Sequence, residues 1–458
     1  ALLLAAAFFS LAKGFDYEEA AILGAICAAL QWSRPAFYRK TALLDAPLST
    51  GWIAAALTAI VASTFAGFFA YKHVAYTSAL WWQFSLNSDA PRFLRTLFGI
   101  AVMLAGLAIW RLLAPAPGRG RASPVLPTQL APALALADHT DAFLAYTGDK
   151  RLLLAEEGDA FLMYRVQGTN WIVMGDPVGR EERWADLLWK LRETADAAQG
   201  RLMLYQISSR CLPHAIDMGL SIVKYGEEAR VDLASFTLAG PRAKSLRYAE
   251  RRALQEGAKF AVIPMEEVPR HIPELKAVSD EWLKAKKQRE KAFSLGSFDP
   301  AYMAHFPCAV VRVEGRIVAF ANILATPNRE EMSVDLMRHV SDEPYGVMDF
   351  LFIRLMQWAQ VEGYRWFTLG IAPLSGIEAR KLAPAWAKGA AFLFRHGEML
   401  YGFEGLRSYK AKFATHWEPR YIAGPRGLGF ARSMAAVHRI VSRPVPARRK
   451  GPAVASVA

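Results

Sequence analysis

The segment CAVVRVEGRIVAFANIL, residues 308–324, decides the fold of the larger part of this 458-residue chain, because it contains two consecutive strand-like runs. A third such run, EMSVDLM, follows at 331–337. Residues 346–362 then show a helical pattern, and 366–370 are again strand-like and lead into a Gly/Pro loop. We therefore expect a β-meander, a helix and a further strand in this order.

The alternation of strands and helices extends toward the N-terminus, which is typical of α/β (α+β) domains. Because the upstream part repeats the theme on a smaller scale, we predict two similar halves, residues 139–240 and 241–425. The other expected strands are 160–166, 170–174, 201–207 and 258–263, and the other expected helices are 181–198, 242–256 and 268–288.

The first part of the chain predicts membrane-spanning helices. Residues 51–71 are 21 residues without a charge, enough to cross the ~30 Å hydrocarbon core of a bilayer. Residues 92–113 predict a second span, 17–33 a weaker third and 1–12 the end of a fourth, with a buried core helix as the alternative. We expect residues 1–113 to be transmembrane and 114–138, rich in Pro, Gly and Ala, to be a linker. Since the sequence begins inside an apolar run without a Met, we also expect it to be the C-terminal part of a longer protein.

The net charge of +13 is distributed unevenly. Residues 1–113 carry +3, residues 114–418 carry +2, and residues 419–458, which contain no acidic residue, carry +8. Basic residues in the short loops around the predicted spans place the globular region on the cytoplasmic side. These residues are Arg34, Arg39, Lys40, Arg111, Arg119 and Arg121.

The C-terminal part, residues 426–458, is predicted to be a basic amphipathic helix followed by a tail. Within 426–443, Phe430, Met434, Val437 and Val441 share one helical face. Such a helix is suited to lie on an anionic membrane, and packing of the same face against the globular region is the alternative.

Composition and missing motifs exclude several classes of protein. With 53% hydrophobic and 21% charged residues, the chain is neither disordered nor fibrous. Its three cysteines show no CxxC spacing and its nine histidines no HxxxH spacing, so neither a disulfide framework nor a metal site is expected. The sequence also lacks a P-loop, a GxSxG motif and a dinucleotide fingerprint, so we expect no cofactor and no ATP or NAD chemistry.

Two clusters of polar residues are candidates for a site. Asp335 and Arg338 lie near the end of the third meander strand, where they would either form a simple ion pair or orient a charged substrate. FEGLRSYKAKF, residues 403–413, places Glu404, Arg407 and Lys410 on one face of a short helix, which could equally be a solvated face.

A Gly/Pro loop and a basic stripe are further candidates. GIAPLSG at 370–376 follows a strand and contains Gly370 and Ser375; its backbone N–H groups could approach an anion or a ribose, or it is a plain turn. Residues 242–291 hold 13 basic and 8 acidic side chains, which suggests contacts with phosphates of a nucleic acid or of lipid head groups. The cations concerned are Lys244, Arg247, Arg251, Arg252, Lys284, Lys286 and Lys287.

Several ordered motifs resemble the multiple peptide resistance factor (MprF) family, the phosphatidylglycerol lysyl- and alanyltransferases. The segments that carry the resemblance are KAFSLGSFD (291–299), SVDLMRH (333–339), YGVMDFLF (345–352), LGIAPLSG (369–376), FEGLRSYKAKF (403–413) and WWQF (81–84). The resemblance implies tandem GNAT-like domains after the last spans of a flippase region. It also implies transfer of an aminoacyl group, lysyl or alanyl, from aminoacyl-tRNA to phosphatidylglycerol, which lowers the negative charge of the membrane and gives resistance to cationic antimicrobial peptides.

The resemblance also assigns roles to residues. It implies that Asp335, Arg338, Glu404 and Lys410 are catalytic, with Asp335 or Glu404 as base or ammonium ligand. Substrate-binding neighbours would be Tyr302, Arg407, Tyr409, Lys412, Gly370 and Ser375, and the basic stripe would bind tRNA. The expected location is the bacterial inner membrane, multi-pass with a cytoplasmic catalytic region, and a homo-oligomer is left open.

Three other functions remain as alternatives. A Fem-like transferase would use the same tRNA donor but would need no membrane spans. An acyl-CoA-dependent N-acetyltransferase would need a Gly-rich loop before the helix at 346, where the sequence is instead EPYGVMDF, residues 343–350. A regulatory cap on a lipid transporter fits the first half, which shows no comparable polar cluster and is expected to be a structural partner.

Overall fold

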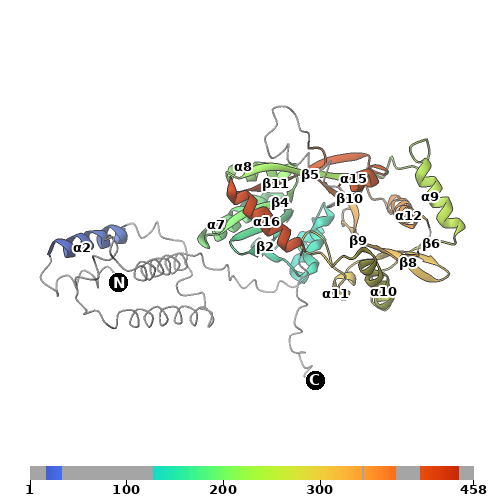
Figure 1. Ribbon diagram of the computed structural model, residues 1–458, viewed down its shortest axis with the longest axis horizontal. Coiled ribbons are helices and arrows are strands. Elements are labelled where there is room, and N and C mark those ends of the chain that lie inside the picture. The colour runs from blue at the N-terminus through green and yellow to red at the C-terminus, as the bar shows by residue number, and fades with distance from the viewer. Residues whose placement is uncertain (1–16, 33–126, 343–344, 378–402, 443–458) are drawn as a thin grey trace, which may run out of the picture. The chain divides into compact units, whose positions relative to one another are not determined.

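The computed structural model describes residues 17–32, 127–342, 345–377 and 403–442 (Figure 1). The chain divides into two compact units, one comprising residues 1–119 and 194–200 and the other residues 120–193 and 201–458. The described part of the first unit outside 194–200 is helix α2, Tyr17–Trp32. The elements of the second unit carry all the candidate site residues.

The predicted membrane segments are only partly described. Residues 51–71 and 92–113 lie outside the described residues, and so do residues 1–12. The third segment, 17–33, coincides with α2, whose 16 residues rise about 24 Å at 1.5 Å per residue. Among the residues that the structure describes, no helix is both long and apolar enough to span a bilayer.

The described strands form one 11-stranded mixed sheet in the order β1-β2-β3-β4-β11-β5-β10-β9-β8-β7-β6. Within it β3 pairs parallel with β4 and β9 pairs parallel with β10, and the other neighbours are antiparallel. The strands are β1 Arg151–Leu154, β2 Ala160–Gln167, β3 Asn170–Gly179, β4 Arg201–Ile207, β5 Ser221–Asp232, β6 Lys259–Ile263, β7 Cys308–Val313, β8 Arg316–Ala325, β9 Glu331–His339, β10 Trp366–Pro373 and β11 His416–Gly424.

Helices connect these strands and cover the sheet (Figure 1). They are α6 Pro127–Ala135, η2 Thr140–Thr147, η3 Glu181–Arg183, α7 Trp184–Ala197, η4 Ser209–Cys211, α8 Leu212–Asp217, α9 Lys244–Gln255, α10 Val268–Lys286, α11 Pro300–Met303, α12 Val347–Val361, α15 Phe403–Ala411 and α16 Leu428–Ser442.

One pattern occurs twice in the sheet. In the first half, the antiparallel pair β2 and β3 is followed by α7 and by β4, which is parallel to β3. In the second half, β8, β9, α12 and β10 repeat this order. The two copies become one sheet because β11 lies between β4 and β5, and β5 in turn pairs with β10.

The core explains why these segments fold as they do. Strand β8 is buried at eight consecutive positions between its first and last residues. Helix α12 buries Phe350, Leu351, Ile353 and Met356 in the same hydrophobic cluster. A second cluster is built by α6, η2, β2 to β4 and α16. Phe143 and Tyr146 of η2 pack against both clusters, so this short helix links the two halves.

The structure bears on two expected features, the linker and the packing alternative for the C-terminal helix. The predicted linker, residues 114–138, is described from Pro127 onward, and there it forms α6, which buries Leu130 and Leu134 on the sheet. The apolar face of α16 also packs on the sheet, with Val437 and Ile440 buried beside β4 and β11 (Figure 1). Since the core already covers this face, packing rather than membrane contact describes its apolar residues.

Candidate active site

The candidate site lies where two parallel strands stop pairing. Hydrogen bonding between β9 and β10 joins Trp366–Thr368 to Glu331–Ser333, whereas both strands continue for several residues beyond this ladder. The carboxyl ends of parallel strands are common ligand sites in α/β sheets, because backbone groups and side chains converge there. The end of this ladder is therefore the natural place to look for a substrate.

A β-bulge aims Asp335 at this place. On β8, Ile323 pairs with Val334 and Ala321 pairs with Met337, so Asn322 alone opposes two residues of β9, Asp335 and Leu336. The Asn322 side chain stabilises the bulge, because its Oδ1 accepts a hydrogen bond of 2.7 Å from the Leu336 N–H. Bulges of this kind redirect one side chain at the cost of a ladder bond, and they are frequent next to active sites.

The Asp335 carboxylate is held by two donors. The Gly296 N–H lies 2.9 and 3.0 Å from its two oxygens, and the Tyr302 hydroxyl donates to Oδ2 at 2.7 Å. Gly296 has to be a glycine, because a Cβ at this position would overlap both Asp335 Oδ2 and the Tyr302 ring. The close approach of the backbone thus fixes the carboxylate in one orientation.

Burial is the largest influence on the pKa values of Asp335 and Tyr302. It raises the pKa of Asp335 above its ordinary value, although the hydrogen bonds from Gly296 and Tyr302 and the charges of Lys150 and Arg338 act in the opposite direction. Burial, followed by the negative charge of Asp335, also raises the pKa of Tyr302 well above 10. Tyr302 therefore keeps its proton and remains a donor, while Asp335 is a stronger base than an ordinary aspartate.

The first half contributes a buried ion pair beside Asp335 that the sequence patterns did not reveal. Lys150 Nζ donates to Asp149 Oδ1 at 2.7 Å and its side chain is only 1% exposed. Asp149 also accepts the Phe293 N–H at 2.6 Å, which ties this turn to the loop that carries Gly296. GDK at 148–150 resembles any turn, so no sequence signal distinguished it.

Lys410 of α15 reaches the end of the adjacent strand, β10. Its Nζ donates to the Ile371 carbonyl oxygen at 2.9 Å, just after Gly370, which has a φ of +77° within a bulge of β10. Burial lowers the pKa of Lys410 to about 8, against the opposing effect of the Glu228 charge. Ser375 belongs to the following turn, where its Oγ donates to the Ala372 carbonyl and accepts the Glu227 N–H, so it holds backbone in place.

Arg338 does not form the simple ion pair with Asp335 that the sequence left open. Its Nη2 donates to Glu290 at 2.9 Å, and its guanidinium lies 4.2 Å from the centroid of the Trp282 ring. Its Nη1 is buried without a hydrogen-bond acceptor among the described residues. That remaining N–H is able to bind an anion.

The other residues of α15 point in different directions. Arg407 lies 3.4 Å from Glu227 and stacks over Trp417, whereas Lys412 reaches Asp349 of α12 at 3.1 Å. Of Glu404 the structure describes only the backbone, in the first turn of α15. Of the two cations on the predicted face, Lys410 thus points inward and Arg407 lies on a flank of α15, while Lys412 follows the helix.

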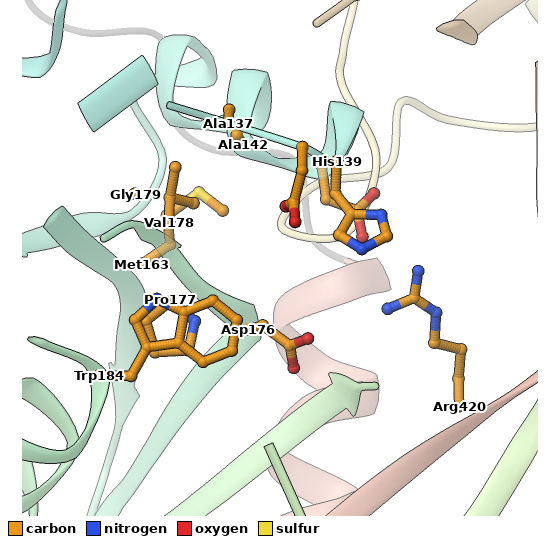
Figure 2. A pocket seen from close by; sticks show the side chains of 12 residues that line it. Ala137, His139, Ala142, Met163, Asp176, Pro177, Val178, Gly179, Trp184 and Arg420 are labelled. Atoms are coloured by element: carbon orange, nitrogen blue, oxygen red, sulfur yellow. The ribbon is translucent and has the colours of Figure 1, made fainter. Parts of the chain in front are cut away.

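A second buried cluster of charges lies at the junction of the halves and was also missed. Arg420 of β11 pairs with Glu228 of β5, while Glu331 of β9 contacts Arg230 at 3.3 Å and His139 at 3.2 Å. Burial alone would lower the pKa of His139, but the hydrogen bond and charge of Glu331 raise it to about 9. Figure 2 shows Arg420, Asp176 and His139 around a cavity of about 20 Å³, which has room for one water molecule.

The predicted nucleic-acid cations are exposed. Lys244, Arg251 and Arg252 project from α9, whose buried side carries Leu246, Ala249 and Ala253, and Lys284, Lys286 and Lys287 end α10. Arg252 pairs with Glu256, and Arg247 donates to the carbonyl oxygens of Leu238 and Gly240, so Arg247 also holds the loop before α9.

Comparison with known proteins shows which family this chain resembles. A family model described as "Phosphatidylglycerol lysyltransferase, C-terminal" matches residues 133–424. Phosphatidylglycerol lysyltransferase of Bacillus subtilis is 37% identical over 302 residues, which cover 66% of this chain and 35% of the relative. The chain thus spans about a third of the length of the curated relatives it matches.

Solved structures agree with this match. The C-terminal domain of a putative lysylphosphatidylglycerol synthetase from Agrobacterium fabrum is 41% identical, with a TM-score of 0.63 over 69% of this chain and 96% of that one. The L-PGS structure from Bacillus licheniformis is 35% identical, with a TM-score of 0.62 over 70% and 98%. The chain therefore belongs to the phosphatidylglycerol lysyltransferase C-terminal family.

Proposed function

We propose that this chain transfers a lysyl group from lysyl-tRNA to a glycerol hydroxyl of phosphatidylglycerol. The observation that carries the proposal is the buried Asp335 carboxylate, which Gly296 and Tyr302 hold where β9 and β10 separate, in a chain of this family; Lys410 reaches the end of β10. The names of the relatives favour lysyl over alanyl as the transferred group.

The fold proposed for this activity is a tandem of two GNAT-like domains, residues 139–240 and 241–425. The repeated order of an antiparallel pair, a helix and a parallel strand supports the tandem arrangement. In each copy the helix crosses from one strand to its parallel neighbour, as the βαβ connection requires. The candidate site lies in the second copy, with Asp149 and Lys150 supplied by the first.

The reaction exchanges one ester for another. The lipid hydroxyl oxygen attacks the carbonyl carbon of the aminoacyl ester, its proton passes to a base, and the ribose oxygen leaves and takes up a proton. No bond energy from a nucleotide is needed, because an ester is broken and an ester is formed. Asp335 suits the role of base, and a well-placed base contributes about 10²- to 10⁴-fold in rate.

Lys410 suits the role of oxyanion donor. One of its N–H groups is used by the Ile371 carbonyl, which leaves donors for the developing negative charge on the ester oxygen. Arg338, whose Nη1 has no acceptor among the described residues, and the partly exposed Arg407 are cations for the lipid phosphate. In this proposal Tyr302, Gly370 and Ser375 position the site, and Tyr409 and Lys412 lie at its edge.

The proposed setting is the cytoplasmic face of a bacterial inner membrane, with further membrane helices and a flippase region preceding the catalytic part. Adding a lysyl group places two ammonium groups on an anionic lipid, which lowers the negative surface charge that attracts cationic antimicrobial peptides. The exposed cations of α9 and α10 would contact the tRNA phosphates.

A direct assay tests the proposal. The purified chain is incubated with vesicles containing phosphatidylglycerol and with lysyl-tRNA or alanyl-tRNA, each labelled in the amino acid, and labelled lipid is measured. We expect lysyl lipid with the first donor. Product from alanyl-tRNA alone would assign the other donor, and no labelled lipid from either would contradict the function.

A further inference from the structure

A groove with a volume of about 330 Å³ lies beside the candidate active site. Its walls come from α9, from the start of α12 and from α15, and α9 contacts α12 along one side (Figure 1). Three tyrosines, Tyr248, Tyr345 and Tyr409, line it together with Asp349 and Lys412. Pockets of this size accommodate small molecules or one end of a larger one.

Consecutive residues of α15 face the groove and the active site. Tyr409 lines the groove, whereas the next residue, Lys410, reaches the Ile371 carbonyl at the end of β10. Because consecutive side chains of a helix point about 100° apart, a ligand in the groove has to extend past α15 to bring its other end to Lys410. Of the two substrates, the one that enters here has to present its ester to Lys410.

The lining is suited to a nucleoside. Tyr248 and Tyr345 are 47% and 63% exposed, which is unusual for large aromatic rings, and they meet edge to face, with centroids 5.9 Å and planes 72° apart. Exposed aromatic rings are the platforms on which unpaired bases stack in nucleic-acid-binding proteins. Asp349 Oδ1 is buried with no donor in the described part of the chain, so a ribose hydroxyl or a base amino group would satisfy it.

The charges around the groove fit RNA better than a lipid. Lys244 and Arg251 project from α9 beside the lining residues Ser245 and Tyr248, where they would meet the phosphates of a strand that ends in the groove. Apart from Ala249, Gly346 and Met348, the lining is aromatic or polar, so it offers little surface for an acyl chain.

We propose that this groove binds the unpaired 3′-terminal adenosine of the aminoacyl-tRNA, with its base stacked on one ring of the Tyr248–Tyr345 pair and its ribose ester extending past α15 to Lys410. The inference rests on the proposed function, because it assigns the tRNA substrate of that function to one side of the candidate active site. The lipid then approaches from the other side of Lys410.

Binding of two RNA hairpins tests the proposal. Both carry the acceptor stem of tRNA(Lys), one ending in CCA and the other in CC, and binding is measured by fluorescence anisotropy. For the unmodified chain we expect the CC hairpin to bind roughly tenfold more weakly, the size of one stacking contact. The double variant Tyr248→Ala and Tyr345→Ala should bind both hairpins equally, and Tyr248→Phe with Tyr345→Phe should restore the preference.

Trp189→Ala is the matched control, because Trp189 is a similarly exposed aromatic residue on α7, outside the groove. A preference for CCA that persists in the double alanine variant would overturn the proposal. The proposal would also be overturned if the double alanine variant lost binding to phosphatidylglycerol vesicles while its RNA binding was unchanged, since the groove would then bind the lipid. If the unmodified chain makes lysyl lipid, either result rejects the adenosine site alone and leaves the proposed function standing.

Discussion

At Asp335 a single carboxylate depends on three local features. The bulge in β9 aims it, the Gly296 N–H and the Tyr302 hydroxyl orient it, and burial raises its pKa. Replacing it by Asn keeps the shape and removes the base. We expect Asp335→Asn to lower kcat about 10²- to 10⁴-fold with little change in the KM for tRNA, measured as labelled lipid formed over time.

Asp280→Asn is the control for this variant, because Asp280 lies on the exposed side of α10 and pairs there with Lys276. Its activity should be unchanged. An Asp335→Asn protein that is folded, by circular dichroism, and as active as the unmodified chain would show that another group accepts the proton.

Lys410 is expected to set the alkaline limit of activity. Its pKa is lowered from 10.5 to about 8, so the ammonium form that donates to an oxyanion is lost as the pH rises through 8. We therefore expect kcat to fall above pH 8, after subtraction of the spontaneous hydrolysis of the aminoacyl ester. Lys410→Arg keeps a cation at any pH used, so in this variant the alkaline fall should disappear even if the rate at neutral pH is lower.

The lowered pKa of Lys410 also affects stability, which should rise with pH where the activity falls. Because folding lowers the pKa of Lys410, a protonated Lys410 opposes folding at neutral pH, and this contribution is relieved as the pH rises between about 8 and 10.5. Activity and stability should thus move in opposite directions over this range. A parallel fall of both in the unmodified chain would indicate that alkaline unfolding, and not Lys410, limits the rate.

At the scale of elements, the sequence predicted neither β5 nor β11, which join the two halves, nor the edge strand β1. The expected strands 160–166, 170–174 and 201–207 and the meander agree with β2, β3, β4 and β7 to β9 within a few residues at their ends. Their long apolar runs make the strand period easy to recognise. Strands β5 and β11 instead carry Glu228, Arg230 and Arg420, which in sequence resemble an exposed loop.

These charges are buried because they pair across strands. Arg420 of β11 and Glu228 of β5 are each 4% exposed at the side chain and bond to one another. Only the neighbour in space makes burial of such a residue tolerable, and a single sequence does not show that neighbour. For the same reason the sequence missed Asp149 and Lys150, whereas Asp335 and Lys410 lie within recognisable motifs and Tyr302 follows one of them by three residues.

The Glu228–Arg420 pair gives a prediction for the joint between the halves. Glu228→Gln leaves the Arg420 guanidinium buried without its carboxylate, and we expect a loss of about 3–5 kcal/mol in the free energy of unfolding, measured by urea denaturation. Glu418→Gln is the matched control on the same pair of strands. Glu418 is 43% exposed and its partner Arg230 keeps Glu331, so we expect a loss below about 1 kcal/mol. Equal losses in the two variants would mean that burial does not set the strength of these pairs.

For the whole molecule, the positions of the charged residues predict polyanion binding better than the total net charge does. Residues 114–418 carry only +2, so attraction of a polyanion has to come from local clusters such as the exposed face of α9. Lys244 and Arg251 are the residues to change, since Arg247 is engaged with the Leu238 and Gly240 carbonyls and its loss would also disturb the loop.

We expect the double variant Lys244→Glu and Arg251→Glu to weaken tRNA binding and to reduce the slope of log affinity against log salt by about 1.4–1.8, because each of the two lost phosphate contacts removes about 0.7–0.9. The measurement is a salt titration by anisotropy with uncharged tRNA. The control is Lys190→Glu with Arg426→Glu, which changes the net charge equally at exposed positions outside α9. If the control pair lowered the slope as much as the α9 pair, the tRNA would respond to the total charge of the molecule, and the basic face of α9 would have no special role in placing the acceptor end beside Tyr248.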